Sequence, residues 1–307
     1  MTTGLKYEYI PLLVISIFAV LANILVCILV LLTRQLRTHT NRFVVSLAIS
    51  DILITGILLP SFLAHVDGTV TDYIGSITLL AGVANISAVT IDRYIAVFRP
   101  FRYNEIMRVW FAKTIILIWT LSIAISLVPL IWGTNQESTP HRVYIFTVQI
   151  CFVILPYALI FIAYFKIFRK VRQTVRKERN LMMSLAISQG QVEKKVCPSS
   201  SESKVTRISI IIAINFMLTW LPVEYMTLVH NMGKSELIPA PLPKLSLYTI
   251  ALGALIDPVV YSYLKSDFRQ AIKRMCRKYS HDNERNMHSI VGSNKTKESA
   301  GYQSTEL

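Results

Sequence analysis

Seven long apolar runs dominate the pattern of hydrophobic and polar positions along the chain. Each run is about 20 residues or longer, which is the length that an α-helix needs to cross a bilayer. The predicted spans are approximately Tyr9–Thr33, Asn41–Ala64, Thr69–Phe98, Trp110–Trp132, Tyr144–Phe168, Ile208–Val229 and Leu245–Leu264. The pattern therefore predicts an all-α membrane protein, a seven-transmembrane helix bundle.

The segments outside these runs divide the chain further. We expect residues 1–8 to form an extracellular N-terminal tail, and residues 9–264 the transmembrane domain. The third cytoplasmic loop, at about residues 171–206, is expected to continue the fifth helix in its first part. A basic face opposite apolar residues at helical spacing predicts a short amphipathic eighth helix on the inner leaflet at residues 265–278. Polar residues 279–307 predict a disordered cytoplasmic tail.

Lysine and arginine are distributed unevenly between the two sides of this domain. If the N-terminus lies outside, the only extracellular ones among the 32 are Lys6, Arg142, Lys234 and Lys244. The positive-inside rule then predicts a multi-pass plasma-membrane protein with its N-terminus outside. The net charge of +14 indicates attraction to anionic membrane lipids, and no nucleic-acid partner.

The four cysteines leave no candidate for an extracellular disulfide. Cys27 and Cys151 lie in predicted spans, and Cys197 and Cys276 lie in predicted cytoplasmic segments. Cys276, in the amphipathic helix, is a candidate palmitoylation site that would add a second membrane anchor, with a free thiol as the alternative.

The last residues of the chain form a candidate partner-binding motif. Thr305 stands two places before the terminal Leu307. A segment of this type suits strand addition to a PDZ domain, whose backbone amides bind the terminal carboxylate.

Ionisable residues inside membrane helices are costly and therefore indicate function. Asp51 lies about midway along the second span, so it is expected to be protonated, paired or bound to a cation. A second buried acid, Asp257, lies in the seventh span, and Asn23 is a polar residue of the first. Asp92 and Arg93 end the third run. Because neighbours on a helix point about 100° apart, Arg93 is expected to be free to pair with another helix, and the alternative is a pair of interface anchors.

Proline and tryptophan residues mark places where the spans bend or meet. Pro156, Pro222 and Pro258 each free a carbonyl and are expected to bend their helices, which opens space inside the bundle. Trp119 in the fourth span is expected to form a hydrogen bond with Ser46 or Asn85.

Together these residues resemble the motifs of the rhodopsin-like (class A) G-protein-coupled receptors, in chain order and with one motif in each span. The matching positions are Asn23, Leu47-Ala48 with Asp51, Asp92-Arg93-Tyr94, Trp119, Pro156 with Tyr164, Trp220 with Pro222, Asp257-Pro258 with Tyr261, and Phe268. The resemblance implies a transducer that carries the signal of an extracellular ligand to a heterotrimeric G protein, with arrestin as a further partner. It implies no enzymatic activity.

The resemblance also assigns roles in activation. Arg93 is held at rest by Asp92 and by Glu202 at the start of the sixth helix, and its release lets that helix swing outward. The implied switch residues are Asp92, Arg93, Tyr94, Tyr164, Glu202, Trp220, Pro222, Pro258 and Tyr261.

Asn23, Asp51 and Asp257 match the internal sodium and proton site of the family. Gly82 stands where the family usually has serine, and Gly253 where it often has asparagine. Fewer oxygen ligands should bind a hard cation less well, so a proton shared by the two acids is the alternative to an allosteric sodium ion.

The sequence constrains the identity of the ligand less than it constrains the class of protein. Gly68 stands where most relatives have a disulfide-forming cysteine, and the absence of that bridge resembles the melanocortin, lysophospholipid and cannabinoid receptors. The residues closer to adenosine receptors are Pro156, Glu202, Arg102-Tyr103-Asn104 and Phe268-Arg269-Gln270. Gly75 replaces the aspartate of the amine receptors. Asp72, Glu224 and Tyr225 are predicted to contact a basic group of the ligand. The alternative is that Glu224 pairs with His230 or with another residue of the protein.

Two other functions stay open from the sequence. An ion-coupled transporter or channel would use Asp51 and Asp257 to line its pathway, although seven spans without inverted repeats argue against it. A structural or constitutively active membrane protein would have no ligand. The sequence contains no metal-ligand cluster, nucleophile–base pair or phosphate-binding loop, so we expect neither catalysis nor an enzymatic cofactor.

Overall fold

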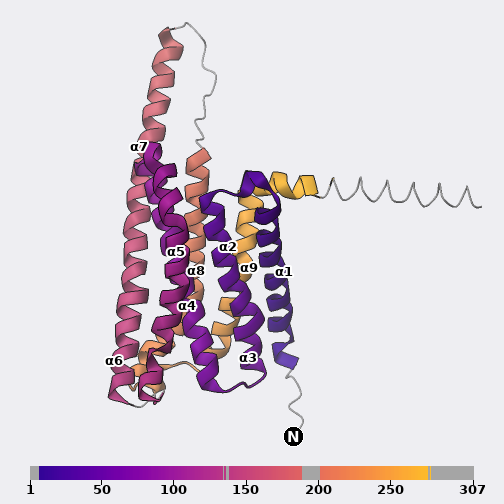
Figure 1. Cartoon of the computed structure of the whole chain (residues 1–307), viewed down its shortest axis with the longest axis vertical. Coiled ribbons are helices and arrows are strands. Elements are labelled where there is room, and N and C mark those ends of the chain that lie inside the picture. The colour runs from indigo at the N-terminus through magenta and orange to yellow at the C-terminus, as the bar shows by residue number, and fades with distance from the viewer. Residues whose placement is uncertain (1–6, 134, 136–137, 189–200, 276, 278–307) are drawn as a thin grey trace, which may run out of the picture.

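In a computed structural model, the chain forms a helical bundle (Figure 1). The structure describes residues 7–133, 135, 138–188, 201–275 and 277. Within them, the seven helical spans of membrane length are Ile10–Leu32, His39–Leu63, Gly68–Phe98, Pro100–Trp132, Thr139–Leu181, Val205–Asn231 and Leu242–Leu264. Each predicted run overlaps one of these spans, so the predicted all-α seven-transmembrane fold is confirmed.

The spans are assembled from α-helices and two π-helical turns. The α-helices are α1 (Ile10–Leu32), α2 (His39–Leu53), α3 (Leu59–Leu63), α4 (Gly68–Phe98), α5 (Tyr103–Leu127), α6 (Thr139–Val148), α7 (Leu155–Ser188), α8 (Ser201–Asn231) and α9 (Leu242–Leu264). The π-helical turns are η3 (Ile54–Leu58), between α2 and α3, and η6 (Gln149–Ile154), between α6 and α7. Short 3-10 segments cover Tyr7–Tyr9, Arg34–Leu36, Pro100–Arg102, Val128–Trp132 and Ser235–Leu237.

Both π-helical turns directly precede a proline near the start of the next helix, Pro60 in α3 and Pro156 in α7. A proline ring has no N–H to donate and crowds the preceding turn, and the wider π-helical turn is one way for a helix to absorb this. Pro222 and Pro258 lie inside α8 and α9.

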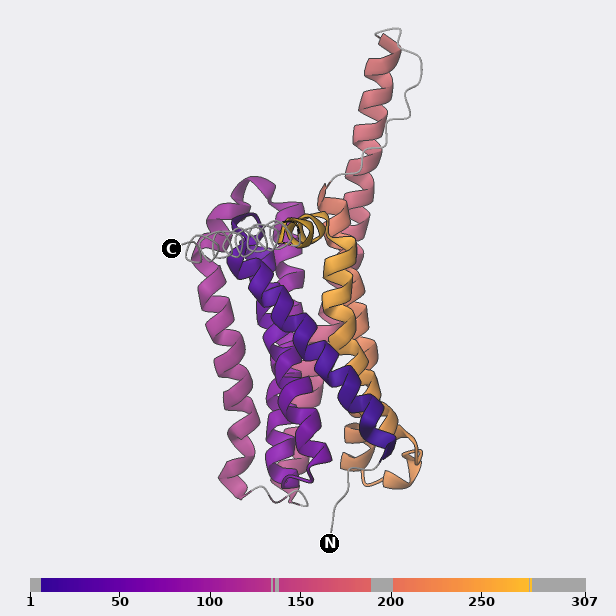
Figure 2. The same ribbon diagram turned by 90° about the vertical axis from the view of Figure 1, so that its right-hand side faces the viewer.

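Helix α4 occupies the middle of the bundle. It packs against α2, α5 and α7 and also contacts α8, whereas α9 packs between α1 and α8. Figures 1 and 2 show the helices running side by side, with α1 crossing the bundle obliquely in the second view. Asp67 caps α4 by accepting a hydrogen bond from the backbone N–H of Thr69 at 2.8 Å, which closes the short connection from α3.

The distribution of polar and apolar side chains is that of a membrane bundle. Large apolar residues such as Phe161 and Leu218 are exposed on the outside, where lipid would contact them. Asn23, Asp51 and Asp257 are buried inside. Polar groups therefore meet each other between helices rather than facing lipid.

The end of the bundle opposite the N-terminus differs in part from prediction. Helix α7 continues to Ser188 and projects beyond the bundle (Figure 1), as expected for the first part of the loop at 171–206. Helix α8 begins at Ser201, so the last residues of that segment are helical where a loop was predicted. Residues 266–275 are helical, within the predicted 265–278 segment, and turn sideways from α9 (Figure 1). The predicted tail at 279–307 and most of the predicted tail at 1–8 lie outside the described residues.

Candidate functional site

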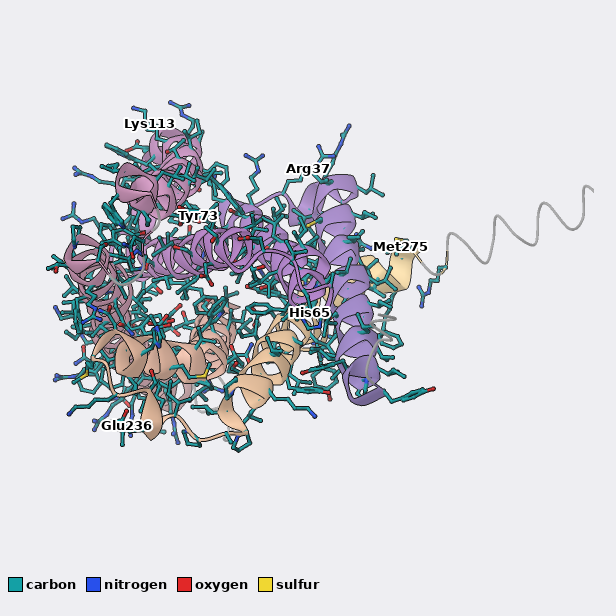
Figure 3. All side chains as sticks on the ribbon, turned by 90° about the horizontal axis from the view of Figure 1, so that it is seen from below. Arg37, His65, Tyr73, Lys113, Glu236 and Met275 are labelled. Carbon is teal, nitrogen blue, oxygen red and sulfur yellow. The ribbon has the colours of Figure 1, made fainter. Side chains whose placement is uncertain are left out.

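A cavity of about 820 Å³ lies between the ends of α4, α6, α8 and α9 on the N-terminal side of the bundle. Cavities of this size hold small organic ligands. Figure 3 views the bundle from this end, with Tyr73 labelled on α4. The wall is mostly apolar, and its polar side chains include Asp72, Tyr73, His141, Gln149, Glu224 and Lys244. Two of the three predicted ligand contacts, Asp72 and Glu224, therefore meet in one cavity.

Glu224 on α8 pairs with Gln149 on the π-helical turn η6. The Gln149 side-chain amide donates to the Glu224 backbone carbonyl at 2.8 Å and to its carboxylate Oε2 at 3.2 Å. The alternative that Glu224 pairs with another residue of the protein is thus realised by Gln149. His230 instead lies beside Ser235, with Nδ1 3.1 Å from Oγ.

Tyr225 lies away from this cavity, contrary to the prediction. Its side chain is 41% exposed, and its hydroxyl donates to the Leu237 carbonyl at 3.1 Å. Because adjacent residues on a helix point about 100° apart, a helix that turns Glu224 inward turns Tyr225 outward. The structure therefore contradicts the placement of Tyr225 in the ligand site.

The mouth of the cavity carries a second polar group of residues. Trp132 Nε1 donates to His141 Nδ1 at 3.3 Å, and this bond requires an unprotonated Nδ1. Asp72 interacts electrostatically with His141. An acid and an aromatic base from different helices thus face the same entrance.

Trp220 lines the inner part of the cavity and is buried. Its ring packs against Phe216, one turn away on α8, with ring centroids 5.9 Å apart. Phe216 fills the space beside Gly82 on α4: a Cβ atom at Gly82 would lie 2.5 Å from two atoms of the Phe216 ring. The absence of a side chain at Gly82 therefore lets α8 place this ring against α4.

Below the cavity, Asp51 and Asp257 are buried and interact electrostatically. Asp257 Oδ1 accepts a hydrogen bond from Asn215 on α8 at 2.9 Å. Asn23 donates to the Ala254 carbonyl at 2.9 Å and to the Ala19 carbonyl at 3.0 Å. The structure therefore brings the three predicted residues to one region, and it adds Asn215, which the sequence analysis missed.

One of the two glycine positions near this acid pair offers no oxygen to a sodium ion. A side chain at Gly253 would lie 2.7 Å from the Thr219 hydroxyl, just as one at Gly82 would overlap Phe216. The two positions where the family places oxygen or nitrogen donors are thus filled by neighbouring side chains, one of them aromatic. Hard cations require several oxygen ligands, and the aromatic ring supplies none.

At the opposite end of the bundle, Asp92 is the centre of a buried hydrogen-bond network. It forms an ion pair with Arg93, whose Nη2 lies 2.6 Å from Asp92 Oδ2. The carboxylate also accepts from the Thr40 hydroxyl at 2.8 Å and from the Tyr103 hydroxyl at 2.7 Å. Arg93 donates a further bond to Thr40. Arg93 therefore pairs with another helix, as expected, through Thr40 on α2. It also forms the ion pair with Asp92 that the resemblance implies, because the long arginine side chain folds back onto its neighbour.

The other predicted switch residues have different environments. Tyr164 on α7 and Tyr261 on α9 are both buried. Tyr94 is partly exposed and stacks on Phe98, with ring centroids 4.4 Å apart, outside the Asp92 network. Glu202 lies in the first turn of α8, and its side chain is outside the part of the chain that the structure describes.

Predicted sites near the C-terminus fall on residues that the structure does not describe. These are Cys276, Thr305 and Leu307.

Lys265, directly after α9, is a buried cation that the sequence analysis missed. Its ammonium group donates to Asn41 Oδ1 on α2 and lies 5.6 Å from the centroid of the Phe268 ring. Burial, with repulsion from Arg93, lowers the pKa of Lys265 from its usual 10.5 to about 8. Lys265 therefore connects the end of α9 to the start of α2 through a side-chain hydrogen bond.

The hydrogen bonds between α2, α4 and α5 agree in part with the prediction. Trp119 Nε1 donates to Ser46 Oγ at 3.1 Å. Asn85 instead donates to Ser50 Oγ at 3.3 Å. The expected contact between Trp119 and Ser46 is therefore confirmed.

The sequence profile of the family described as 7 transmembrane receptor (rhodopsin family) matches residues 22–261. The chain belongs to this family. The match runs from the residue before Asn23 to Tyr261, the span that holds the cavity, the acid pair and the Asp92 network.

Individual relatives agree with the family. The receptor is 28% identical to adenosine receptor A2a of Cavia porcellus, over 87% of this chain and 72% of the relative. It is 26% identical to the histamine H2 receptor of Canis lupus familiaris, over 88% and 79% of the two chains. A crystal structure of squid rhodopsin superposes with a TM-score of 0.72 at 22% identity, over 91% and 87%, which shows the shared fold.

Membership of this family defines the general activity. The protein is a multi-pass membrane receptor that couples an extracellular ligand to a heterotrimeric G protein, and it is not an enzyme. The adenosine-like part of the predicted relationship is confirmed by these relatives, whereas the melanocortin-like part stays a prediction. The comparisons do not support the transporter or channel alternative.

Proposed function

We propose that the receptor lies in the plasma membrane with its N-terminus outside, and that its ligand enters the cavity from the extracellular side. The unequal distribution of lysine and arginine supports this orientation, because it gives the Arg93 end most of the positive charge. The position of the cavity near the N-terminus is the observation that carries the proposal, since the ligand site and the Arg93 network then face opposite compartments.

We further propose a path between the two ends. Trp220 lines the cavity on α8, and the Phe216 ring beside it presses into the space that Gly82 leaves on α4. Ligand-driven movement of Trp220 and Phe216 would shift α8 against α4. The helix would bend at Pro222, which lies inside α8.

At the inner end, this movement would release Arg93 from Asp92 and from the predicted partner Glu202, and open a cleft for the G protein. Tyr164, Tyr261 and the Pro258 segment of α9 would rearrange with it.

For the ligand, we propose a molecule with a basic group that contacts Glu224 and Asp72. Both acids line the same cavity, which supports this chemistry. The relatives carry names of receptors for a nucleoside and for an amine, at similar identities, so their names do not choose between these ligand classes. The choice of a basic group rests on the two carboxylates.

A screen of amine, nucleoside and peptide ligands in cells that report second-messenger output tests the proposal. Once a ligand is found, we expect Trp220→Ala to reduce its maximal response and Glu224→Gln to reduce its potency. A potency loss of about twofold or less in Glu224→Gln, equivalent to under about 0.5 kcal/mol, would exclude the Glu224 contact. A response unchanged by every cavity substitution would point to a receptor without a ligand in this cavity.

The acid pair and the C-terminal region carry three smaller proposals. We propose that Asp51 and Asp257 do not hold an allosteric sodium ion, which the filled space at Gly82 supports. Palmitoylation of Cys276 would anchor the helix at 266–275 to membrane lipids. Recognition of the C-terminus by a PDZ protein predicts that a pull-down loses its partner when Leu307 is removed. Arrestin binding to the active receptor remains an expectation from the family resemblance.

A further inference from the structure

The contact between Glu224 and Gln149 leaves two oxygens without hydrogen-bond donors. Gln149 donates through Nε2 to Glu224 Oε2, and its second N–H bond goes to the Glu224 backbone carbonyl. Glu224 Oε1 and Gln149 Oε1 are both buried and have no partner among the described residues. Each unpaired buried acceptor costs about 1–3 kcal/mol, and more if it is charged. Two such atoms in one contact require an explanation.

We propose that Glu224 carries a proton on Oε1 in the resting receptor and donates it to Gln149 Oε1. This bond and the existing bond from Gln149 Nε2 to Glu224 Oε2 would close a cyclic acid–amide pair. A single proton then satisfies both unpaired oxygens, and a proton needs no extra space in a buried site. An ionised Glu224 would instead leave a buried negative charge with one side-chain donor.

Other titratable groups around the contact do not provide the same solution. Tyr157 on α7 has a buried hydroxyl without a partner among the described residues, and it interacts electrostatically with Glu224. If Tyr157 donated to Glu224 Oε1, Gln149 Oε1 would still have no donor. The remaining titratable side chains that line the cavity are Tyr9, Asp72, Tyr73, His141, Tyr144, His230 and Lys244. Neither unpaired oxygen accepts a hydrogen bond from these side chains in the described part of the structure.

The pair has a mechanical consequence, because it joins the π-helical turn η6 to α8. Loss of the proton would remove one of its two bonds and create a charge beside an apolar wall. We therefore expect the protonated pair to stabilise the resting position of α8, and its deprotonation to favour movement of α8.

This inference rests on the proposed receptor function and specifies the chemistry of its ligand. The cavity would take an organic cation with N–H donors, such as an ammonium or guanidinium group, in exchange for the proton. The Glu224 carboxyl then becomes a carboxylate that accepts from the cation, and the proton leaves through the cavity to water. The carboxyl that exchanges its proton for the cation would thus lie on α8, and Asp72 on α4 would contact the same basic group from the other side of the cavity.

Infrared difference spectroscopy of the full-length receptor in lipid nanodiscs tests the proton directly. A protonated carboxyl has a C=O stretching band that ionised carboxylates lack. We expect Glu224→Gln to lose such a band, and Glu236→Gln, the same substitution at an exposed acid near the cavity end (Figure 3), to keep it. Loss of carboxylate bands in Glu224→Gln, with the carboxyl band intact, would overturn the proposal.

Two partner variants test the pairing and do not depend on the folding of Glu224→Gln. Gln149→Leu should shift the carboxyl band, because the acid loses its acceptor, whereas Tyr157→Phe should leave the band in place. The reverse result would identify Tyr157 as the partner and overturn the acid–amide pair.

A second experiment measures basal second-messenger output in cells as a function of extracellular pH. Raising the pH removes the proton, so wild-type output should rise, by at most about tenfold per pH unit for one proton. Glu224→Gln should stay low and flat, because glutamine donates as the acid does, and Glu236→Gln should behave as wild type. If Glu224→Gln shows the same pH response as wild type, the proposed exchange of the Glu224 proton is overturned. If no variant signals at any pH, the proposed coupling of the cavity to the Arg93 network fails, while the infrared result still decides the acid–amide pair.

Discussion

The guanidinium group of Arg93 folds back onto the carboxylate of Asp92, with Nη2 2.6 Å and Nε 3.0 Å from Oδ2. The same carboxylate accepts hydrogen bonds from Thr40 on α2 and Tyr103 at the start of α5. Asp92 is fully buried. Three helices therefore converge on one charge, and Arg93 cannot turn away without leaving that charge partly unpaired.

Removing the Tyr103 hydroxyl should weaken the resting state. A hydrogen bond to a charged acceptor contributes about 1.5–3 kcal/mol, and about 1 kcal/mol already changes a two-state equilibrium fivefold. We therefore expect Tyr103→Phe to raise basal second-messenger output several-fold at matched surface expression. Tyr263→Phe is the control, since the Tyr263 side chain is exposed on the outside of α9. Equal basal output in Tyr103→Phe and wild type would show that the network does not restrain the receptor.

A methyl group at Gly82 should destabilise the bundle. Its Cβ would lie 2.5 Å from the Phe216 ring, so α4 and α8 must separate or the ring must move. Overpacking of this type costs about 1–3 kcal/mol. We expect Gly82→Ala to lower the melting temperature of the detergent-solubilised receptor, and Phe216→Leu to restore part of the loss in the double variant. A melting temperature that is unchanged in Gly82→Ala would contradict the close packing of Phe216.

Sodium should have little effect on this receptor. The Phe216 ring fills the space that a side chain at Gly82 would need, so this position supplies no oxygen ligand to a hard cation beside the acid pair. Exchange of sodium chloride for choline chloride at constant ionic strength should leave both melting temperature and basal output unchanged. Stabilisation by sodium that disappears in Asp51→Asn would establish a sodium site and refute this prediction.

Lys265 should make stability depend on alkaline pH. Its pKa is lowered to about 8, whereas an unfolded lysine titrates near 10.4. Between these values the unfolded chain binds more protons, so stability should rise as the pH increases from about 8 to about 10. We expect this rise in melting temperature to be smaller in Lys265→Met than in wild type. Lys273→Met, at an exposed position on the next helix, should retain it. Equal slopes in all three proteins would contradict the burial of a charged Lys265.

The pattern of apolar residues predicts the membrane spans, because a segment inside the bilayer must satisfy its backbone hydrogen bonds within its own helix. The contact between Trp119 and Ser46 was predictable for a related reason, since an indole N–H in an apolar span needs an acceptor on a neighbouring helix. The rotation of α8 was not predictable to one residue, so Glu224 and Tyr225 were both placed in the cavity although only Glu224 lines it.

Partners from distant parts of the chain were the main omissions. Gln149 and Asn215 are polar residues within apolar runs, and that signal could have marked them as buried. Their pairing with Glu224 and Asp257 depends on which helices are neighbours and on the π-helical turn η6, which no local pattern specifies. Thr40 and Tyr103 were missed for the same reason, because both lie outside the motif that contains Asp92.

The most direct measurement compares basal second-messenger output of wild type, Arg93→Ala and Glu202→Ala at equal surface expression. If Arg93 is the switch and Glu202 its second restraint, Arg93→Ala should abolish the signal and Glu202→Ala should raise it several-fold. Full output from Arg93→Ala would contradict the assignment of Arg93 as the residue through which this receptor reaches its G protein.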